Sequence, residues 1–150
     1  MFLIEASINS LRAHIEILAI IESKLDNAIN DHEVYIPGFE IVRRGRQING
    51  RKGGGACFCL RSNLNFKGCE ELIIDRLECL TVEISKSHSW PFLVSTWYKP
   101  PTSPPDLFND FENLIGRIDG SNRELYLVGD INTNQLPGVA DSNSSKLINV

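Results

Sequence analysis

Hydrophobic residues near the start of the chain recur at helical spacing. Between positions 8 and 29 they fall three or four residues apart, which predicts one helix or two consecutive helices. They are Ile8, Leu11, Ile15, Leu18, Ile21, Leu25 and Ile29. Ser7 or Asn9 is a suitable cap for the start of this helix. Within the same stretch, Ile17–Ile21 is also a β-prone run that ends at Glu22, so a strand there stays open as the alternative.

The middle and later parts of the chain alternate between short β-prone runs and turn residues. Strands are predicted at Phe39–Val42, Gly54–Arg61, Cys79–Ile84, Phe92–Tyr98 and Leu125–Val128. Asn49-Gly50, between the first two runs, predicts a hairpin turn. Apolar and polar residues alternate in Cys79–Ile84, which is typical of a half-buried strand, whereas the uninterrupted apolar run Leu125–Val128 predicts a buried one.

One further helix is predicted before the last strand. Ser103 is the expected N-cap, prolines follow it, and apolar residues from Leu107 to Ile118 lie at helical spacing before Gly120. Few helices among many strands indicate an α+β protein with a mostly antiparallel sheet, compatible with two packed sheets covered by helices. The Ser/Asn-rich segment 137–150 predicts a weakly ordered polar tail, which leaves 1–136 as the folded domain.

The composition narrows the class of protein. The chain has 150 residues, of which 42% are hydrophobic, as expected for one globular domain. Its net charge is −4, from 15 basic and 19 acidic residues, so nucleic-acid binding needs a local patch. There is no basic leader and no run of about 20 apolar residues, so we expect no membrane association and a nuclear or cytoplasmic location. The four cysteines fit no zinc-ligand spacing and are expected to be buried free thiols.

A basic segment lies around the predicted hairpin turn. Arg43, Arg44, Arg46 and Lys52 precede the three glycines of positions 53–55. Arginine presents a planar fork that matches phosphate, and glycines let backbone N–H groups approach a ligand closely. The segment therefore predicts phosphate or DNA-backbone binding, with a flexible, solvated hairpin tip as the alternative.

Candidate chemistry follows the last predicted strand. Asp130 and Asn132 come directly after Leu125–Val128 and Gly129, and alternate residues of an extended segment point to the same side. A carboxylate there can bind a hard cation or accept a proton from water, and an amide can donate to an oxyanion. Tyr98 also ends a predicted strand. The alternatives are a strand followed by an Asx turn, and an amphipathic tyrosine at the rim.

Seven short motifs occur in an order that resembles the endonuclease/exonuclease/phosphatase superfamily. Within it, the chain is most similar to the apurinic-endonuclease-like domain at the front of non-LTR (LINE-type) retrotransposon polyproteins, which also carry a reverse transcriptase. The likeness runs from about Ser7 to Asn134. The motifs are Ile20-Ile21-Glu22-Ser23-Lys24-Leu25, Gly38-Phe39, Arg43-Arg44, Gly53-Gly54-Gly55, Glu83-Ile84, Tyr98-Lys99-Pro100-Pro101 and Gly129-Asp130-Ile131-Asn132.

The resemblance implies a DNase-I-like, four-layer α/β sandwich of two mostly antiparallel sheets. It also implies a hydrolase that cuts DNA phosphodiester bonds with Mg²⁺ or Mn²⁺. Carried over by position, Glu22 would bind the metal and Tyr98 would contact the scissile phosphate. Asp130 would orient or deprotonate the attacking water, and Asn132 would hold a phosphate oxygen. The basic hairpin would face the DNA backbone, and no obligate protein partner is evident.

Three departures from the family pattern shape the expectations. Ser7 stands where the family has an asparagine. The family's late aspartate–histidine pair has no histidine counterpart here, because His14, His32 and His88 all precede Asp130. The connection before Glu22 is too short for a βαβ crossover. We therefore expect a truncated domain, incomplete at its N-terminal helix–strand connection and its C-terminus.

Loss of the histidine predicts little or no nuclease activity. A non-catalytic DNA-backbone-binding or interaction module, using the basic hairpin 43–52, is the alternative. A calcineurin-like metallophosphatase also places Gly-Asp after a strand, but it needs several late histidines and is disfavoured.

Overall fold

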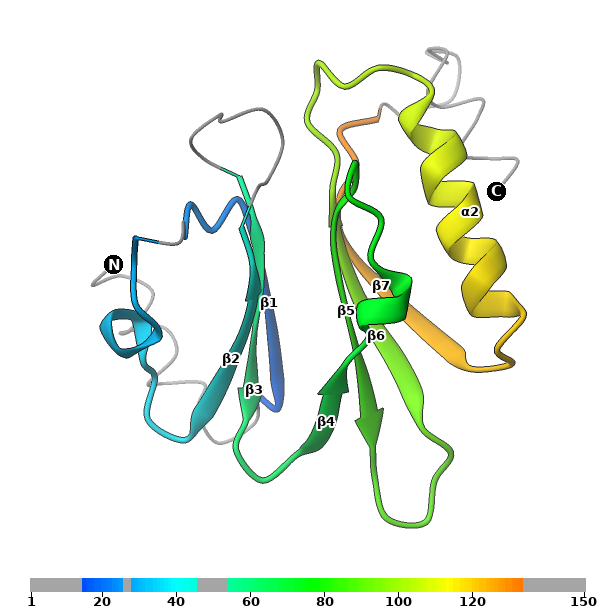
Figure 1. Cartoon of the computed structure of the whole chain (residues 1–150). Helices are drawn as coiled ribbons and strands as arrows, with labels where there is room; N and C mark the ends of the chain where they lie inside the picture. The colour runs from blue at the N-terminus through cyan, green and yellow to red at the C-terminus, as the bar shows by residue number, and fades with distance from the viewer. Residues whose placement is uncertain (1–14, 26–27, 46–53, 134–150) are drawn as a thin grey trace.

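Two sheets face each other in the computed structural model, which describes residues 15–25, 28–45 and 54–133 (Figure 1). The first sheet has the order β1-β3-β2 and the second β4-β5-β6-β7. All neighbouring strands are antiparallel except β6 and β7, which are parallel. The strands are β1 Ile17–Ile21, β2 Phe39–Arg44, β3 Ala56–Arg61, β4 Asn65–Gly68, β5 Glu78–Ser85, β6 Phe92–Tyr98 and β7 Glu124–Asp130.

The helix α2, Leu107–Asp119, covers the outer face of the second sheet, and two short 3₁₀ helices, η1 Asp31–Val34 and η2 Glu70–Leu72, lie in the connections (Figure 1). The architecture is thus the predicted α+β sandwich. It is incomplete as a four-layer fold, because within the described ranges no α-helix covers the outer face of the first sheet.

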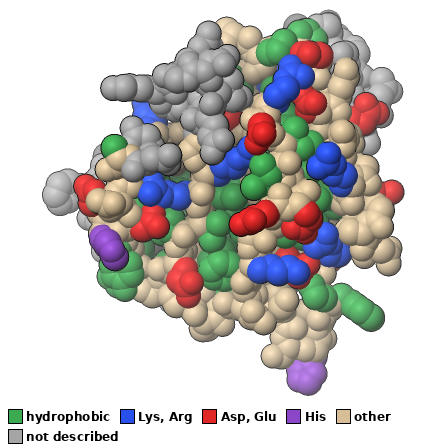
Figure 2. Space-filling view, viewed as in Figure 1, with side chains coloured by type: hydrophobic (Ala, Val, Ile, Leu, Met, Phe, Trp, Pro, Cys, Tyr) green, Lys and Arg blue, Asp and Glu red, His purple; other side chains and the backbone are tan. Residues whose placement is uncertain are grey.

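Charges of both signs share the surface. Figure 2 shows Lys and Arg side chains interspersed with Asp and Glu on the face viewed in Figure 1. This mixture agrees with the nearly balanced composition of the chain. Among the described residues, no helix is long and apolar enough to span a bilayer.

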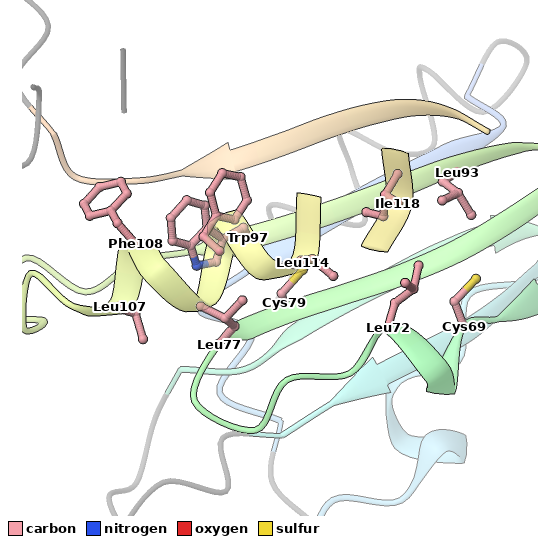
Figure 3. Packing of buried hydrophobic residues seen from close by; sticks show 11 residues of the cluster. Cys69, Leu72, Leu77, Cys79, Leu93, Trp97, Leu107, Phe108, Leu114 and Ile118 are labelled. Carbon is pink, nitrogen blue, oxygen red and sulfur yellow. The ribbon is translucent and has the colours of Figure 1, made fainter. Parts of the chain in front are cut away.

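Two hydrophobic layers lie on opposite faces of the second sheet. The layer between the sheets contains Ala56, Phe58, Leu60, Leu80, Val82, Ile84 and Val94. The layer beneath α2 includes Cys79, Leu93, Trp97, Phe108, Phe111 and Leu114 (Figure 3). The prediction of a half-buried strand over Cys79–Ile84 is therefore wrong, because α2 covers its second face. On that face the Thr81 and Ser95 hydroxyls hydrogen-bond at 2.8 Å. All four cysteines of the chain are buried free thiols, as predicted.

The first described strand decides between the two interpretations of its sequence. Ile17–Ile21 is a strand, and the helical interpretation is wrong over these residues. It pairs antiparallel with β3, from Ile17 opposite Leu60 to Ile21 opposite Ala56. Those pairings satisfy its backbone groups without a helix. Residues 8–14 of the predicted helix, with its proposed caps, lie outside the described residues.

The last strand is less covered than its sequence predicts. The apolar run at 125–128 belongs to β7, which extends to Asp130 and pairs only with β6 within the described residues. Tyr126, Leu127 and Val128 remain 50%, 41% and 44% exposed. The prediction of a buried strand is wrong because an edge strand lacks a neighbour on one side.

Other boundaries differ by a few residues. The N-cap of α2 is Asp106 rather than Ser103, because Pro104 and Pro105 form a tighter turn before the helix. The helix ends at Asp119, before Gly120, as predicted, and β6 has the predicted bounds. Strand β4 was not predicted, since its mixed composition carries no β pattern. The predicted turn at 49–50, the boundary at 136 and the tail 137–150 lie outside the described residues.

Candidate active site

Three polar residues stand side by side at one end of the second sheet. Strand register places Glu78 of β5 opposite Tyr98 of β6, and Tyr98 opposite Asp130 of β7. Leu80 and Val82, two and four residues beyond Glu78, pack toward the first sheet. Alternate residues of a strand share a face, so the row Glu78–Tyr98–Asp130 faces the first sheet at the rim of the sandwich.

Asp130 and Asn132 are joined by an Asx turn. The Asn132 N–H donates to Asp130 Oδ1 at 2.9 Å, and Asn132 Nδ2 donates to the Lys99 carbonyl at 3.0 Å. The Lys99 N–H in turn donates to the Asp130 carbonyl at 2.9 Å. Strand β7 ends at Asp130, so the turn, rather than strand alternation, brings Asn132 to the site. The Asx turn and the candidate site therefore involve the same residues. The hydrogen bond of the turn to Oδ1 fixes the Asp130 carboxylate.

Glycine is needed immediately before Asp130. Gly129 has φ +154°, and a Cβ built on it would lie 2.0 Å from the Trp97 carbonyl oxygen of β6. Only a residue without a side chain lets β7 approach β6 this closely. The close approach sets where Asp130 lies beside Tyr98.

Glu22 follows the end of β1, in the first sheet. Strand β1 also contacts β6 and β7 across the sandwich. The next two residues are tied to the glycine segment, since the Ser23 N–H donates to Gly55 O at 3.1 Å and the Lys24 N–H to Gly54 O at 2.8 Å. Glu22 is exposed, and its carboxylate has no partner in the described part of the chain. A free carboxylate is a suitable ligand for a hard cation.

The backbone at Glu22 is strained, because its φ is +50°. A side chain in this left-handed region costs on the order of 1 kcal/mol. Glu22→Gly is therefore expected to raise the free energy of unfolding by about 1 kcal/mol while removing the carboxylate. Urea denaturation measures the change. Glu22→Gln keeps the Cβ and serves as the control with wild-type stability; an equal gain in both variants would contradict the argument.

Glu78 is the site residue that the sequence analysis did not single out. Its side chain is largely buried, and its Oε2 accepts the Gly55 N–H at 3.1 Å. The available signal was an acid directly before the alternating segment 79–84, at a predicted strand end. That signal is weak, because acids often flank strands on the surface.

The two described arginines of the basic segment are engaged within the protein. Arg43 Nε pairs with Asp31 Oδ1 at 2.6 Å, and its Nη2 donates to the Ile29 carbonyl at 2.7 Å. Arg44 donates to the backbone carbonyl of Cys79 in β5 and to two carbonyls in the connection before β5. Arg46 and Lys52 lie outside the described residues. DNA-backbone binding by this hairpin therefore stays a prediction.

Lys99 is fully buried directly after Tyr98. Its Nζ lies 5.5 Å from the centre of the Phe108 ring and has no hydrogen-bond partner in the described ranges. Burial of an ammonium costs several kcal/mol, which is more than the roughly 2 kcal/mol contributed by a cation–π contact with an aromatic ring. Lys99→Met, which keeps the apolar stem, is expected to raise the melting temperature. Lys99→Ala, which leaves a cavity beside Phe108, is the contrasting variant, and a lower melting temperature for both would refute the explanation.

No histidine belongs to the described site. His32 lies in η1, and His88 lies in the turn between β5 and β6, at the end opposite Glu78. The described residues also contain no group of three or more His, Cys, Asp or Glu side chains able to hold a metal. Mg²⁺ usually takes one or two carboxylates and completes its shell with water and substrate phosphate. Glu22 and Asp130 supply two carboxylates at the same end of the sandwich, which is the donor chemistry of such a shared site, and the described residues form no cage of their own.

Comparison with known proteins shows a likeness of fold. No family model matches the sequence, and no curated protein shows significant similarity to it. The endonuclease domain of TRAS1, a telomere-specific non-LTR retrotransposon, is 18% identical, with a TM-score of 0.69 over 97% of this chain and 61% of that one.

The Xenopus laevis APE2 catalytic domain is 11% identical, with a TM-score of 0.63 over 97% of this chain and 61% of that one. ANGEL2, a 2′,3′-cyclic phosphatase, is 14% identical, with a TM-score of 0.59 over 90% and 43%. This chain thus spans at most about three fifths of the structures it resembles here.

Proposed function

The chain has the DNase-I-like endonuclease/exonuclease/phosphatase fold, and on that premise we propose that it carries part of a divalent-metal-dependent phosphodiesterase site acting on DNA. The observation that carries the proposal is the row Glu78–Tyr98–Asp130 at adjacent strand ends, with the Glu22 carboxylate at the end of β1 in the facing sheet. The likeness to the TRAS1 endonuclease domain supports DNA as the substrate.

Asp130 is the proposed acceptor of the proton from the attacking water. Its Oδ1 already accepts the Asn132 N–H, so the carboxylate is held in one orientation, and Oδ2 accepts no hydrogen bond from the described residues. A positioned carboxylate of this kind contributes general-base catalysis. Its effect depends on alignment, and the hydrogen bonds through Lys99 supply that alignment.

Asn132 and Tyr98 are the proposed phosphate contacts. The Asn132 amide has two hydrogens on Nδ2, and one of them goes to the Lys99 carbonyl. Within the residues that the structure describes, the other has no acceptor, and we assign it to a phosphate oxygen. Tyr98 lies beside Asp130 and would contact the scissile phosphate. Donors aimed at the charge that develops on the phosphate stabilise the transition state.

Glu22 is the proposed metal ligand. A divalent cation, when bound, polarises the phosphoryl group. The fit rests on two carboxylates at facing strand ends, which is the donor chemistry that Mg²⁺ and Mn²⁺ favour. We expect weak binding without substrate, because phosphate oxygens and water would complete the shell.

Turnover by the isolated chain is expected to be very slow. The described site contains no imidazole, and none of the three histidines follows Asp130 in the sequence. Removing one member of a cooperative hydrolytic site usually costs several orders of magnitude in rate. A binding measurement therefore tests the site more directly than an activity assay does.

The test is a titration with Mn²⁺ followed by NMR, since the paramagnetic ion broadens nearby amide signals. Broadening is expected around residues 22–23 and 130–132, and is expected to disappear in Glu22→Gln and in Asp130→Asn. Broadening confined to other surfaces would overturn the proposal. In parallel, plasmid nicking with Mg²⁺ should be near background; vigorous nicking that Asp130→Asn abolishes would contradict only the expected low rate.

The basic hairpin supports a second, non-catalytic function as a DNA-backbone contact. Arg43 and Arg44 are occupied within the protein, so Arg46 and Lys52 are the better test positions. Charge reversal at these two positions is expected to weaken a DNA gel shift and to reduce its salt dependence. An unchanged DNA affinity after the charge reversal would exclude this contact.

We also propose a retroelement origin for the chain, as the motif order and the likeness to the TRAS1 endonuclease domain suggest. The genomic sequence next to the coding region tests it. A reverse-transcriptase reading frame is expected downstream, and an unrelated single-copy gene in that place would speak against this origin.

A further inference from the structure

The proposed site is divided between two sheets. Glu22 ends a strand of the first sheet, whereas Tyr98 and Asp130 end strands of the second. Reacting groups must be held within about 0.5 Å of their productive positions. Two sheets that meet through apolar side chains can slide, because hydrophobic contact has no preferred direction. Directional contacts at this end are needed to hold the two halves in register.

Arg44 supplies such contacts. It is the last residue of β2, in the first sheet, and its side chain is only 13% exposed. Its Nη1 donates to the carbonyls of Leu77 at 3.2 Å and Cys79 at 3.0 Å, at the start of β5. Its Nη2 donates to the Ile74 carbonyl at 3.3 Å and to Asp75 Oδ1 at 3.4 Å. One guanidinium therefore joins the first sheet to the strand that carries Glu78.

A second link runs beside the first. Gly55, the residue directly before β3, donates its N–H to Glu78 Oε2 at 3.1 Å. Its carbonyl accepts the N–H of Ser23, the neighbour of Glu22, at 3.1 Å. A Cβ at Gly55 would lie 3.0 Å from the Arg44 carbonyl oxygen and 3.3 Å from Ser23 Oγ. Gly55 thus links the backbone of Ser23, next to Glu22, to the Glu78 carboxylate, and the Arg44 backbone lies close against it.

We propose that Arg44 is a positioning residue: its guanidinium clamps the two sheets at this end and holds Glu22 at a fixed place relative to the row Glu78–Tyr98–Asp130. The effect of the clamp on metal binding rests on the proposed function. The clamp itself is present in the metal-free protein. Arg44 then affects the site by fixing the relative position of the two sheets, and not by contacting DNA phosphate.

The geometry needs arginine in particular. Three carbonyls and one carboxylate oxygen accept from the guanidinium, two from Nη1 and two from Nη2, and a planar fork can reach all of them at once. A lysine at this position carries its three donors on one nitrogen, which cannot span all four acceptors. Arg44→Lys keeps the charge and loses the fork, whereas Arg44→Met also loses the charge, so the two variants separate geometry from electrostatics.

The experiment compares these variants with Arg61→Met. Arg61 lies at the opposite end of β3, where its Nε donates to the Ile15 carbonyl at 3.0 Å, so it is a matched arginine of the same sheet far from the site. The first measurement is hydrogen exchange of the Gly55 amide in metal-free protein. Exchange is expected to be about ten-fold faster or more in both Arg44 variants and unchanged in Arg61→Met.

The second measurement is the Mn²⁺ dissociation constant from the NMR titration. It is expected to rise about ten-fold in both Arg44 variants and to stay constant in Arg61→Met. The third is the salt dependence of DNA binding, which should keep its slope in Arg44→Met, because a phosphate contact would lower the slope by roughly one.

Three results would overturn the clamp. One is normal Gly55 exchange in folded Arg44→Lys, and another is a Mn²⁺ constant that changes equally in the Arg61 control. The third is a salt slope reduced by about one, which would make Arg44 a DNA contact. If wild-type protein binds no Mn²⁺ near Glu22, the proposed function fails, and Gly55 exchange still decides the clamp.

Discussion

Replacing Gly129 with alanine is expected to destabilise the protein by about 3 kcal/mol or more. The new Cβ would lie 2.0 Å from the Trp97 carbonyl oxygen, 2.9 Å from its carbonyl carbon and 3.0 Å from its nitrogen. All three are backbone atoms of β6, so no side-chain rotation relieves the clash. Either β7 must separate from β6 near Asp130, or β6 must move away from α2. Urea denaturation monitored by circular dichroism measures the loss.

Gly116→Ala is the matched control for this substitution. Gly116 lies within α2, and a Cβ there meets no atom within 4 Å. Alanine in an exposed helix position should stabilise the protein by about 0.5–1 kcal/mol. The two glycine-to-alanine changes therefore have opposite expected signs. A Gly129→Ala protein with wild-type stability would show that β6 and β7 do not approach as described.

The same substitution bears on the site. Asp130 follows Gly129 directly and is held by the Lys99 N–H, so a shift of β7 displaces the carboxylate from Tyr98. Gly129→Ala protein that remains folded at low temperature is expected to lose the Mn²⁺ broadening around residues 130–132. Retention of that broadening would mean that the Asx turn positions Asp130 without help from the strand pairing.

Trp97→Ala is expected to cost about 3–5 kcal/mol, the range for truncating a buried aromatic residue. Trp97 is fully buried between β6 and α2, beside Phe108 (Figure 3). Its ring stacks on Phe111 at a centroid distance of 3.9 Å and meets Phe108 edge to face at 5.8 Å. Alanine would leave a cavity beneath the helix that rigid neighbours cannot fill. The melting temperature and the urea midpoint should both fall sharply.

Trp97→Phe separates packing from hydrogen bonding. The indole Nε1 has no hydrogen-bond partner in the described part of the chain, so phenylalanine loses volume and no hydrogen bond. We expect it to cost about 1–2 kcal/mol, well below the alanine variant. If both substitutions cost the same, the indole N–H has an unrecognised partner and the packing explanation is insufficient.

The candidate site was predictable where its residues mark strand ends. Tyr98 precedes Lys99-Pro100-Pro101, and prolines end a strand because they lack the donor that the ladder needs. Asp130 follows Gly129 at the end of an apolar run. These are local signals, and the ordered motifs that contain them predicted the DNase-I-like fold, which is confirmed. The catalytic roles assigned through the resemblance stay predictions.

Residues whose roles depend on a distant strand could not be predicted in the same way. The sequence around Glu78 has no motif, and its place opposite Tyr98 follows from strand register alone. Arg43 and Arg44 were predicted to bind phosphate, because the sequence gives the charge of a residue but not the group that it contacts in the fold. Their forks turn toward Asp31 and toward backbone carbonyls that lie 30 to 35 positions beyond Arg44.

The sequence by itself determined the α+β class, the helix at Leu107–Asp119, the strand Phe92–Tyr98 and the polar residues that end β6 and β7, because short-range spacing and proline or glycine signals specify them. Tertiary structure alone decided that Ile17–Ile21 is a strand, since five consecutive apolar residues fit either period until β3 pairs with them. It also decided that β7 is an edge and that Arg44 joins the sheets. Burial and pairing depend on which segments meet, and no local pattern carries that information.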